Sequence, residues 1–245
     1  MTAAVLVAHG SRDPRFAVTA GRLRDAVARS TPGIAVTLAY LDLDEPSVGD
    51  VLARVDGDVA VVPLLLGDAY HNRVDLPALL GESARPGLRT VHTPVLADPR
   101  LTGALADRAV DAGLDAGDGV LMCAVGSSDA AADAETRHRG DDLAAALSSR
   151  GVDVPVEVAF ATRSDTILAA DRRLRDADAQ RVLVAPWFLS AGTLTDRVER
   201  VLDDADRPWR MAGPLGAHQA VVDVVRARIV DALAHVMSDS RSTHR

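Results

Sequence analysis

The chain is built from two halves that repeat both the order of their segments and their local motifs. The stretch VLVAHGSRD at 5–13 matches LMCAVGSSD at 121–129, with Gly, Ser and Asp at corresponding places. The stretch VPLLLGDAYHNRV at 62–74 likewise matches APWFLSAGTLTDR at 185–197, keeping the Pro and the apolar run. Repetition of order and motif together predicts a duplicated fold. The 245 residues then form two domains of about 120 residues each, near the usual domain size.

Short β-branched apolar runs alternate with longer segments of helical period in each half. We predict strands at 3–8, 35–41, 59–66, 88–93, 120–124, 156–161, 181–187 and 210–212, and helices near 14–30, 46–55, 75–84, 99–113, 129–150, 164–176, 194–204 and 217–237. Near-continuous apolar strands that alternate with helices are typical of a parallel sheet covered on both faces. The predicted fold class is therefore α/β, with two parallel-sheet lobes.

The repeat also sets the expected domain boundaries. We expect an N-terminal lobe over 1–115 and a C-terminal lobe over 118–237, with the Ala-Gly-Asp-Gly stretch at 116–119 as the linker. The polar residues 238–245 are expected to form a disordered tail.

Charge and cysteine content exclude several classes of function. A formal net charge of −8 argues against nonspecific binding to nucleic acid or to an anionic membrane surface. Cys123 is the single cysteine, so the chain has no internal disulfide and no multi-cysteine metal site. The sequence shows no signal peptide and no apolar run near the ~20 residues that span a bilayer. We expect a cytoplasmic protein.

Three polar residues distinguish the first half from the second. The places of His9, Asp42 and His71 are taken in the second half by Val125, Thr162 and Leu194. If these three residues were needed to build the fold, the second half should have kept them. The difference predicts a single functional site in the N-terminal half.

The predicted topology can bring these three residues together. Each lies at or just beyond the carboxyl end of a predicted strand, where open parallel sheets bind their ligands. Two imidazoles and one carboxylate suit a divalent transition metal such as Fe²⁺, Co²⁺ or Ni²⁺ and leave coordination positions open. Asp42 could instead cap the helix that follows it, and Glu45 could supply the carboxylate in its place.

Competing motifs are weaker. The chain has neither G-x-G-x-x-G nor G-x-x-x-x-G-K-[ST], so nucleotide binding is not indicated. G-x-S-x-G is also missing, which argues against a serine hydrolase built on Ser11. We expect Cys123 to be a buried core thiol, His92 to be packed in a strand, and His218 to cap a helix.

The ordered motifs L-V-A-H-G-S-R-D-P, Y-L-D-L-D-E-P-S and V-P-L-L-L-x₄-H-x₃-D-L-P resemble the sirohydrochlorin chelatases, over nearly the whole chain. The resemblance implies the long form of that family, with two flavodoxin-like lobes facing each other across a cleft. It implies insertion of Fe²⁺ or Co²⁺, without ATP, into sirohydrochlorin on the way to sirohaem or cobalamin; related enzymes insert Ni²⁺. No permanent cofactor is expected, and with only Cys123 the chain cannot carry the cysteine-rich cluster segment of some relatives.

The same resemblance assigns roles to individual residues. His9 and His71 match the metal-binding and catalytic histidines, and Asp42 stands where a Glu is common. Because sirohydrochlorin is a polycarboxylate, we predict that it is bound by Ser11 and by four arginines, namely Arg12, Arg73, Arg163 and Arg197.

Several alternatives remain open at this stage. A nonenzymatic carrier of metal or tetrapyrrole could use the same fold, as could a ligand sensor with two α/β lobes. The sequence does not choose the metal, the pathway, the histidine that acts as base, or between a monomer and a homodimer.

Overall fold

The computed structural model describes residues 2–67, 74–205 and 207–242. Within these residues, strands and helices alternate throughout, as predicted. In chain order, the elements are β1 (Thr2–Ala8), α1 (Pro14–Ser30), β2 (Ala35–Tyr40), α2 (Val48–Leu52), β3 (Gly57–Pro63), α3 (Leu76–Glu82), β4 (Leu88–His92), α4 (Arg100–Asp111), β5 (Asp118–Ala124), α5 (Ala130–Ser148), β6 (Val156–Phe160), α6 (Ser164–Asp176), β7 (Arg181–Pro186), α7 (Thr193–Asp203), β8 (Trp209–Met211) and α8 (Gln219–Ser242).

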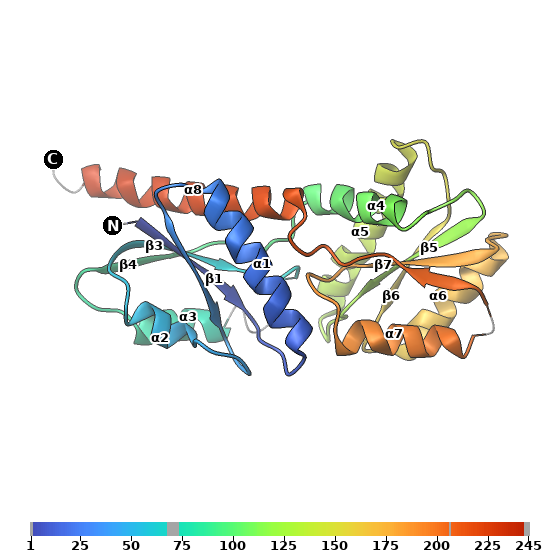
Figure 1. Ribbon diagram of the computed structural model, residues 1–245, viewed down its shortest axis with the longest axis horizontal. Helices are drawn as coiled ribbons and strands as arrows, with labels where there is room; N and C mark the ends of the chain where they lie inside the picture. The colour runs from blue at the N-terminus through green and yellow to red at the C-terminus, as the bar shows by residue number, and fades with distance from the viewer. Residues whose placement is uncertain (1, 68–73, 206, 243–245) are drawn as a thin grey trace. The chain divides into compact units, whose positions relative to one another are not determined.

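The strands form two parallel sheets with the same topology (Figure 1). The first sheet has the order β2-β1-β3-β4, with Val5 opposite both Thr37 and Val61. The second has the order β6-β5-β7-β8, with Met122 opposite both Val158 and Ala185. The repeated strand order confirms the predicted α/β duplication.

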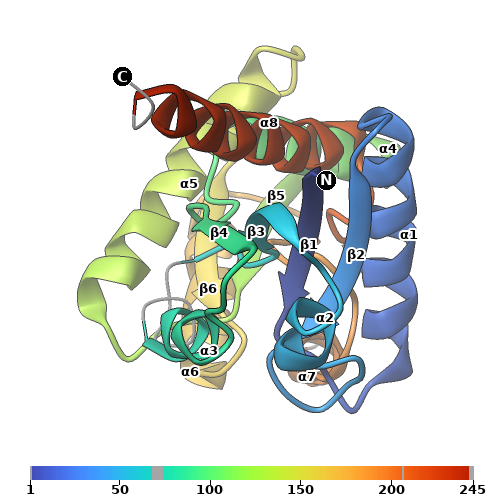
Figure 2. The same cartoon turned by 90° about the vertical axis from the view of Figure 1, so that its left-hand side faces the viewer.

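Helices cover both faces of the first sheet because its central strand is apolar on both sides. Ala3, Val5 and Val7 pack with apolar residues of α2 and α3. The alternate residues of β1, such as Leu6, are equally buried and point to the opposite face. Figures 1 and 2 show α1 and α8 on that opposite side. None of the helices that the structure describes combines the length and apolar character needed to cross a bilayer.

The chain forms two compact units, and each unit contains the last helix of the other half of the sequence. The first unit comprises residues 1–97 and 221–245, and the second comprises 98–220. Helix α4 thus belongs to the second unit, where it packs against α5 and β7. Helix α8 belongs to the first, where Arg228 Nη2 donates to the Val95 carbonyl (3.5 Å). These divisions differ from the boundary at 115–118 that the sequence repeat indicates.

Two local expectations are wrong. Asp118 and Gly119, expected in a linker, are buried residues of β5. The linker interpretation followed their turn-forming residue types, but tertiary packing decides here. The tail expected from residue 238 onward is helical through Ser242, because α8 meets no Gly or Pro in this stretch.

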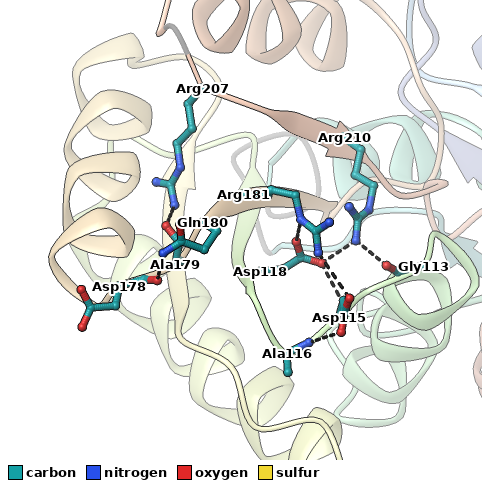
Figure 3. Close-up of polar contacts among 10 residues, drawn as sticks. All are labelled: Gly113, Asp115, Ala116, Asp118, Asp178, Ala179, Gln180, Arg181, Arg207 and Arg210. Atoms are coloured by element: carbon teal, nitrogen blue, oxygen red, sulfur yellow. Dashed lines mark hydrogen bonds and ion pairs between the residues drawn. The ribbon is translucent and has the colours of Figure 1, made fainter.

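An ionic network fixes the amino-terminal ends of the strands in the second unit (Figure 3). The carboxylate of Asp118 is fully buried and accepts from Arg181 Nε (2.8 Å), from Arg210 and from the Asp115 amide (2.8 Å). Hydrogen bonding to this carboxylate raises the pKa of Arg181. The network lies at the end of the sheet opposite to the carboxyl ends of its strands.

Candidate functional site

Two of the predicted site residues lie side by side at the carboxyl end of the first sheet. His9 directly follows β1, and Asp42 lies two residues beyond β2. The amides of Leu41 and Asp42 donate to the carbonyl oxygens of Ala8 (2.9 Å) and His9 (3.0 Å). The pairing of β1 with β2 therefore continues past the strand ends and holds the two segments together. His9 is half-buried, whereas Asp42 is exposed.

The topology makes this end of the sheet a natural binding position. Strands β1 and β3 are the central pair, and the strand order reverses at β1. Ligands of open α/β sheets bind outside the carboxyl ends at such a reversal. The segment after β3 lies next to the end of β1, because the Leu64 amide donates to the Val7 carbonyl (2.7 Å).

Gly10 allows the two loops to meet closely. Its φ is +95°, and a Cβ atom there would lie 1.7 Å from the carbonyl oxygen of Asp42. Only glycine combines this backbone conformation with such a close approach. The contact between the β1–α1 and β2–α2 loops therefore requires glycine at the position after His9.

A tight turn shapes the second of these loops. The Asp44 amide donates to the Asp42 carbonyl (2.8 Å) across Leu43, whose φ is +64°. This is the hydrogen bond of a γ-turn, and a positive φ at leucine is a strained conformation of the kind that clusters at binding sites. Asp42 Oδ1 accepts from the Leu43 amide (2.8 Å), and Asp44 Oδ2 accepts from the Ser11 amide (2.9 Å).

The residues after His9 build the start of α1. Ser11 Oγ accepts from the Asp13 amide (3.1 Å), and Asp13 caps the helix by accepting from the Arg15 amide (3.0 Å). Hydrogen bonds from Arg15 hold the pKa of Asp13 below its usual value. Arg12 is exposed beside this turn. Ser11 and Arg12 thus belong to the turn that joins His9 to α1.

The second unit repeats this turn without the imidazole and the carboxylate. The Thr162 amide donates to the Val125 carbonyl (3.2 Å), as Asp42 does to His9, and the Asp129 amide donates to Ser127 Oγ (3.0 Å). The geometry confirms that Val125 and Thr162 occupy the places of His9 and Asp42. Val125 is 46% exposed, so an apolar side chain reaches the surface where the first unit has an imidazole.

In the second unit, the residue that follows Thr162 is Arg163. Arg163 pairs with the buried carboxylate of Asp133, and its guanidinium lies 4.4 Å from the centre of the Phe160 ring. Arg137 approaches the same ring at 5.0 Å. Arg163 is thus held by both a charge and an aromatic face. Arg197, the other arginine predicted here, donates to Ser164 Oγ (3.3 Å).

Two further predicted site residues cannot be placed in the fold. His71 and Arg73 lie outside the described residues. Among the residues that the structure does describe, no group of three or more His, Cys, Asp and Glu side chains is arranged to hold a metal ion.

Three residues that we assigned to the scaffold have the expected structural roles. His92 ends β4 and is half-buried, and His218 Nδ1 accepts from the Ala220 amide (3.2 Å) at the start of α8. Cys123 is buried, and burial raises the pKa of its thiol to about 12, so it holds no nucleophilic thiolate at neutral pH.

Asp44 and Asp133 were missed in the sequence analysis, although the repeat contains the signal that could have found them. Asp133 aligns with Ala17, and Arg163 aligns with Leu43. The ion pair of the second unit thus has two apolar counterparts in the first, where Asp44 accepts from Ser11 instead.

Comparison with known proteins places these features in a family. The model of the CbiX family matches residues 3–112 and 119–232, which is most of both halves. The chain is 24% identical to the sirohydrochlorin cobaltochelatase of Priestia megaterium, over 95% of this chain and 80% of that enzyme. It is 23% identical to the sirohydrochlorin ferrochelatase of the same organism, over 99% of this chain and 90% of that enzyme.

A solved structure has the same fold. The sirohydrochlorin chelatase SirB from Bacillus subtilis subspecies spizizenii, determined in complex with cobalt, superimposes with a TM-score of 0.74. Its sequence is 20% identical, and the match covers 96% of each chain.

Proposed function

The chain belongs to the CbiX family, and from that premise we propose that it inserts a divalent metal ion, Co²⁺ or Fe²⁺, into sirohydrochlorin without ATP. The observation that carries the proposal is the asymmetry between two otherwise equivalent turns. His9 and Asp42 stand at the strand ends of the first unit, whereas Val125 and Thr162 stand at the same hydrogen-bonded places of the second. In this proposal the first unit supplies the metal ligands and the proton acceptors.

The reaction needs groups that bind a metal and accept protons. Two pyrrole N–H protons must leave the macrocycle while the metal ion exchanges its earlier ligands for ring nitrogens. A neutral imidazole binds borderline metals and, with an ordinary pKa near ~6.5, accepts protons at neutral pH. We assign both tasks to His9 and His71, with the carboxylate of Asp42 as the third ligand. Each imidazole would accept one pyrrole proton on the nitrogen that the metal ion leaves as it passes to the ring nitrogens, which accounts for the two protons released.

The substrate carboxylates need cationic partners on an acidic protein. We assign this role to the four arginines predicted above, namely Arg12, Arg73, Arg163 and Arg197. The Ser11 hydroxyl is assigned a hydrogen bond to the substrate. The exposed position of Arg12 next to His9 supports its assignment. Arg163 is already paired with Asp133, so it would contact substrate through the remaining edge of its guanidinium.

The proposal is tested by following the absorbance of sirohydrochlorin with Co²⁺, Fe²⁺ or Ni²⁺, against a protein-free control. We expect His9→Ala to lower the rate at least ~100-fold, the usual contribution of a general base. His138→Ala is the matched control, because this exposed histidine of α5 lies on the scaffold surface, and it should retain the full rate. Equal rates for wild type and His9→Ala would contradict the proposal. A stoichiometric spectral change without turnover would indicate a carrier.

A further inference from the structure

We propose that Asp44 is a positioning residue that holds the turn carrying His9 against the turn carrying Asp42. This inference rests on the proposed function, because it concerns the geometry of two of the assigned metal ligands. Asp44 itself does not contact the metal in this scheme. Its carboxylate acts through the backbone of Ser11, two residues after His9.

The contacts around Asp44 form a closed set. Its Oδ2 accepts from the Ser11 amide (2.9 Å), which ties the β2–α2 loop to the β1–α1 loop. Its own amide donates to the Asp42 carbonyl (2.8 Å), and that carbonyl lies against Gly10. The Asp42 amide then donates to His9 (3.0 Å). Every link of this ring joins the two loops or sets the turn between them, so the ring fixes the backbones of His9 and Asp42 relative to each other.

The second unit shows what the same serine amide does where no histidine is present. The Ser127 amide donates to Asp133 Oδ1 (2.8 Å), and Asp133 belongs to α5, the helix that Ser127 itself precedes. This bond satisfies the amide within one loop and its helix. The first unit has Ala17 at the place of Asp133 and takes its acceptor from the neighbouring loop instead.

This change of acceptor points to coupling of the loops. An aspartate at position 17 would satisfy the Ser11 amide from within α1. Asp44 directly follows the γ-turn at Leu43, a residue with positive φ that stands at the place of Arg163 of the second unit. Strain of this kind persists only where surrounding contacts hold it. In the unit with the proposed metal ligands, the structure retains the strained arrangement that connects them.

Cobalt binding to the full-length protein, measured by titration calorimetry, tests this role. We expect Asp44→Ala to weaken Co²⁺ binding about 10- to 100-fold, as loss of groups that orient metal ligands usually does. Asp44→Asn keeps an acceptor oxygen and should stay within about threefold of wild type. Asp50→Ala is the matched control, because its carboxylate lies in α2, directly after the same loop, and accepts from Ser47 and not from the β1–α1 loop among the described residues, and it should leave the affinity unchanged.

A second-site variant distinguishes coupling of the two loops from the mere presence of a hydrogen-bond acceptor for the Ser11 amide. Asp44→Ala combined with Ala17→Asp supplies the acceptor from α1, as in the second unit. We expect this double variant to recover the melting temperature lost in Asp44→Ala but not the Co²⁺ affinity. Recovery of both would overturn the positioning role, as would an Asp44→Asn variant as weak as Asp44→Ala.

The histidine variant keeps this proposal distinct from the proposed function. If His9→Ala binds Co²⁺ as tightly as wild type, the metal site itself is refuted and the positioning role falls with it. If His9→Ala loses Co²⁺ affinity while Asp44→Ala and Asp50→Ala both bind Co²⁺ as tightly as wild type, only the positioning role is refuted.

Discussion

At the scale of single residues, Gly10 sets the strictest condition on the site. We expect Gly10→Ala to destabilise the fold more than Gly33→Ala, although both glycines have similar positive φ values of +95° and +87°. Gly33 has open space around it, so its substitution reports backbone strain alone, about 1–2 kcal/mol. At Gly10 the new methyl group also meets the Asp42 carbonyl, which adds about 1–3 kcal/mol of overpacking.

Chemical denaturation of both glycine variants measures this difference in the free energy of unfolding. The Gly10→Ala variant should also lose cobalt affinity, because relief of the overlap pushes the Asp42 loop away from His9. Equal stabilities for the two variants would show that the loops separate without penalty.

The sequence alone singles out His9 and Asp42 as candidates, because their counterparts in the second half are Val125 and Thr162, and their metal-binding role stays a prediction. The sequence was not sufficient to find Asp44. The stretch LDLDEPS offers three carboxylates at alternating or adjacent positions, and their directions depend on a turn with positive φ at Leu43. Leucine rarely adopts that conformation, so residue type gives no signal for it.

At the scale of elements, the helices and strands were predicted closely because their apolar periods are regular. Helix α1 has the predicted bounds and starts at Pro14, directly after the Asp13 cap. The prediction for β3 extended to residue 66, but the strand ends at Pro63. The apolar run continues past it because Leu64 is also buried, at 4% exposure. A buried residue just beyond a strand is as apolar as a residue within it, so hydrophobicity alone does not locate the end of the strand.

The buried Asp118 network is a test of how β5, β7 and β8 are held together. We expect Asp118→Ala to lower the free energy of unfolding by about 2–4 kcal/mol, because it removes charge-assisted hydrogen bonds from a buried site while its arginines still reach solvent. Asp115→Ala is the control: this carboxylate is 70% exposed and 3.4 Å from the same Arg181, and its loss should change stability by about 0–1 kcal/mol.

Denaturant titration of both aspartate variants gives the comparison. A loss in Asp115→Ala as large as that in Asp118→Ala would mean that burial of the carboxylate does not decide the strength of this network.

At the scale of the whole molecule, the division into compact units is the feature that the repeat could not predict. Sequence similarity marks where one copy ends and the next begins, near residue 116. It does not specify which sheet the last helix of each copy covers, because an apolar helix face predicts burial but not the sheet against which the helix packs. The structure assigns α4 to the second unit and α8 to the first, so a division at the repeat boundary removes one helix from each core.

Two fragments that differ only at their amino-terminal ends test this arrangement. Fragment 98–220 contains the complete second unit, whereas fragment 117–220 lacks α4. Leu101 and Leu105 of α4 are fully buried, and each contributes about 1.5–3 kcal/mol. Since domains have a net stability of only about 5–15 kcal/mol, losing both side chains and the rest of α4 removes most of it.

We therefore expect 98–220 to unfold cooperatively in a thermal melt followed by circular dichroism, and 117–220 to show no cooperative transition. The substitution Leu105→Ala within 98–220 should fall between them, with a lower melting temperature but a transition that remains cooperative. If 117–220 melts as sharply and at the same temperature as 98–220, then α4 is not part of the second core. The repeat boundary would then be the true boundary of the folding units.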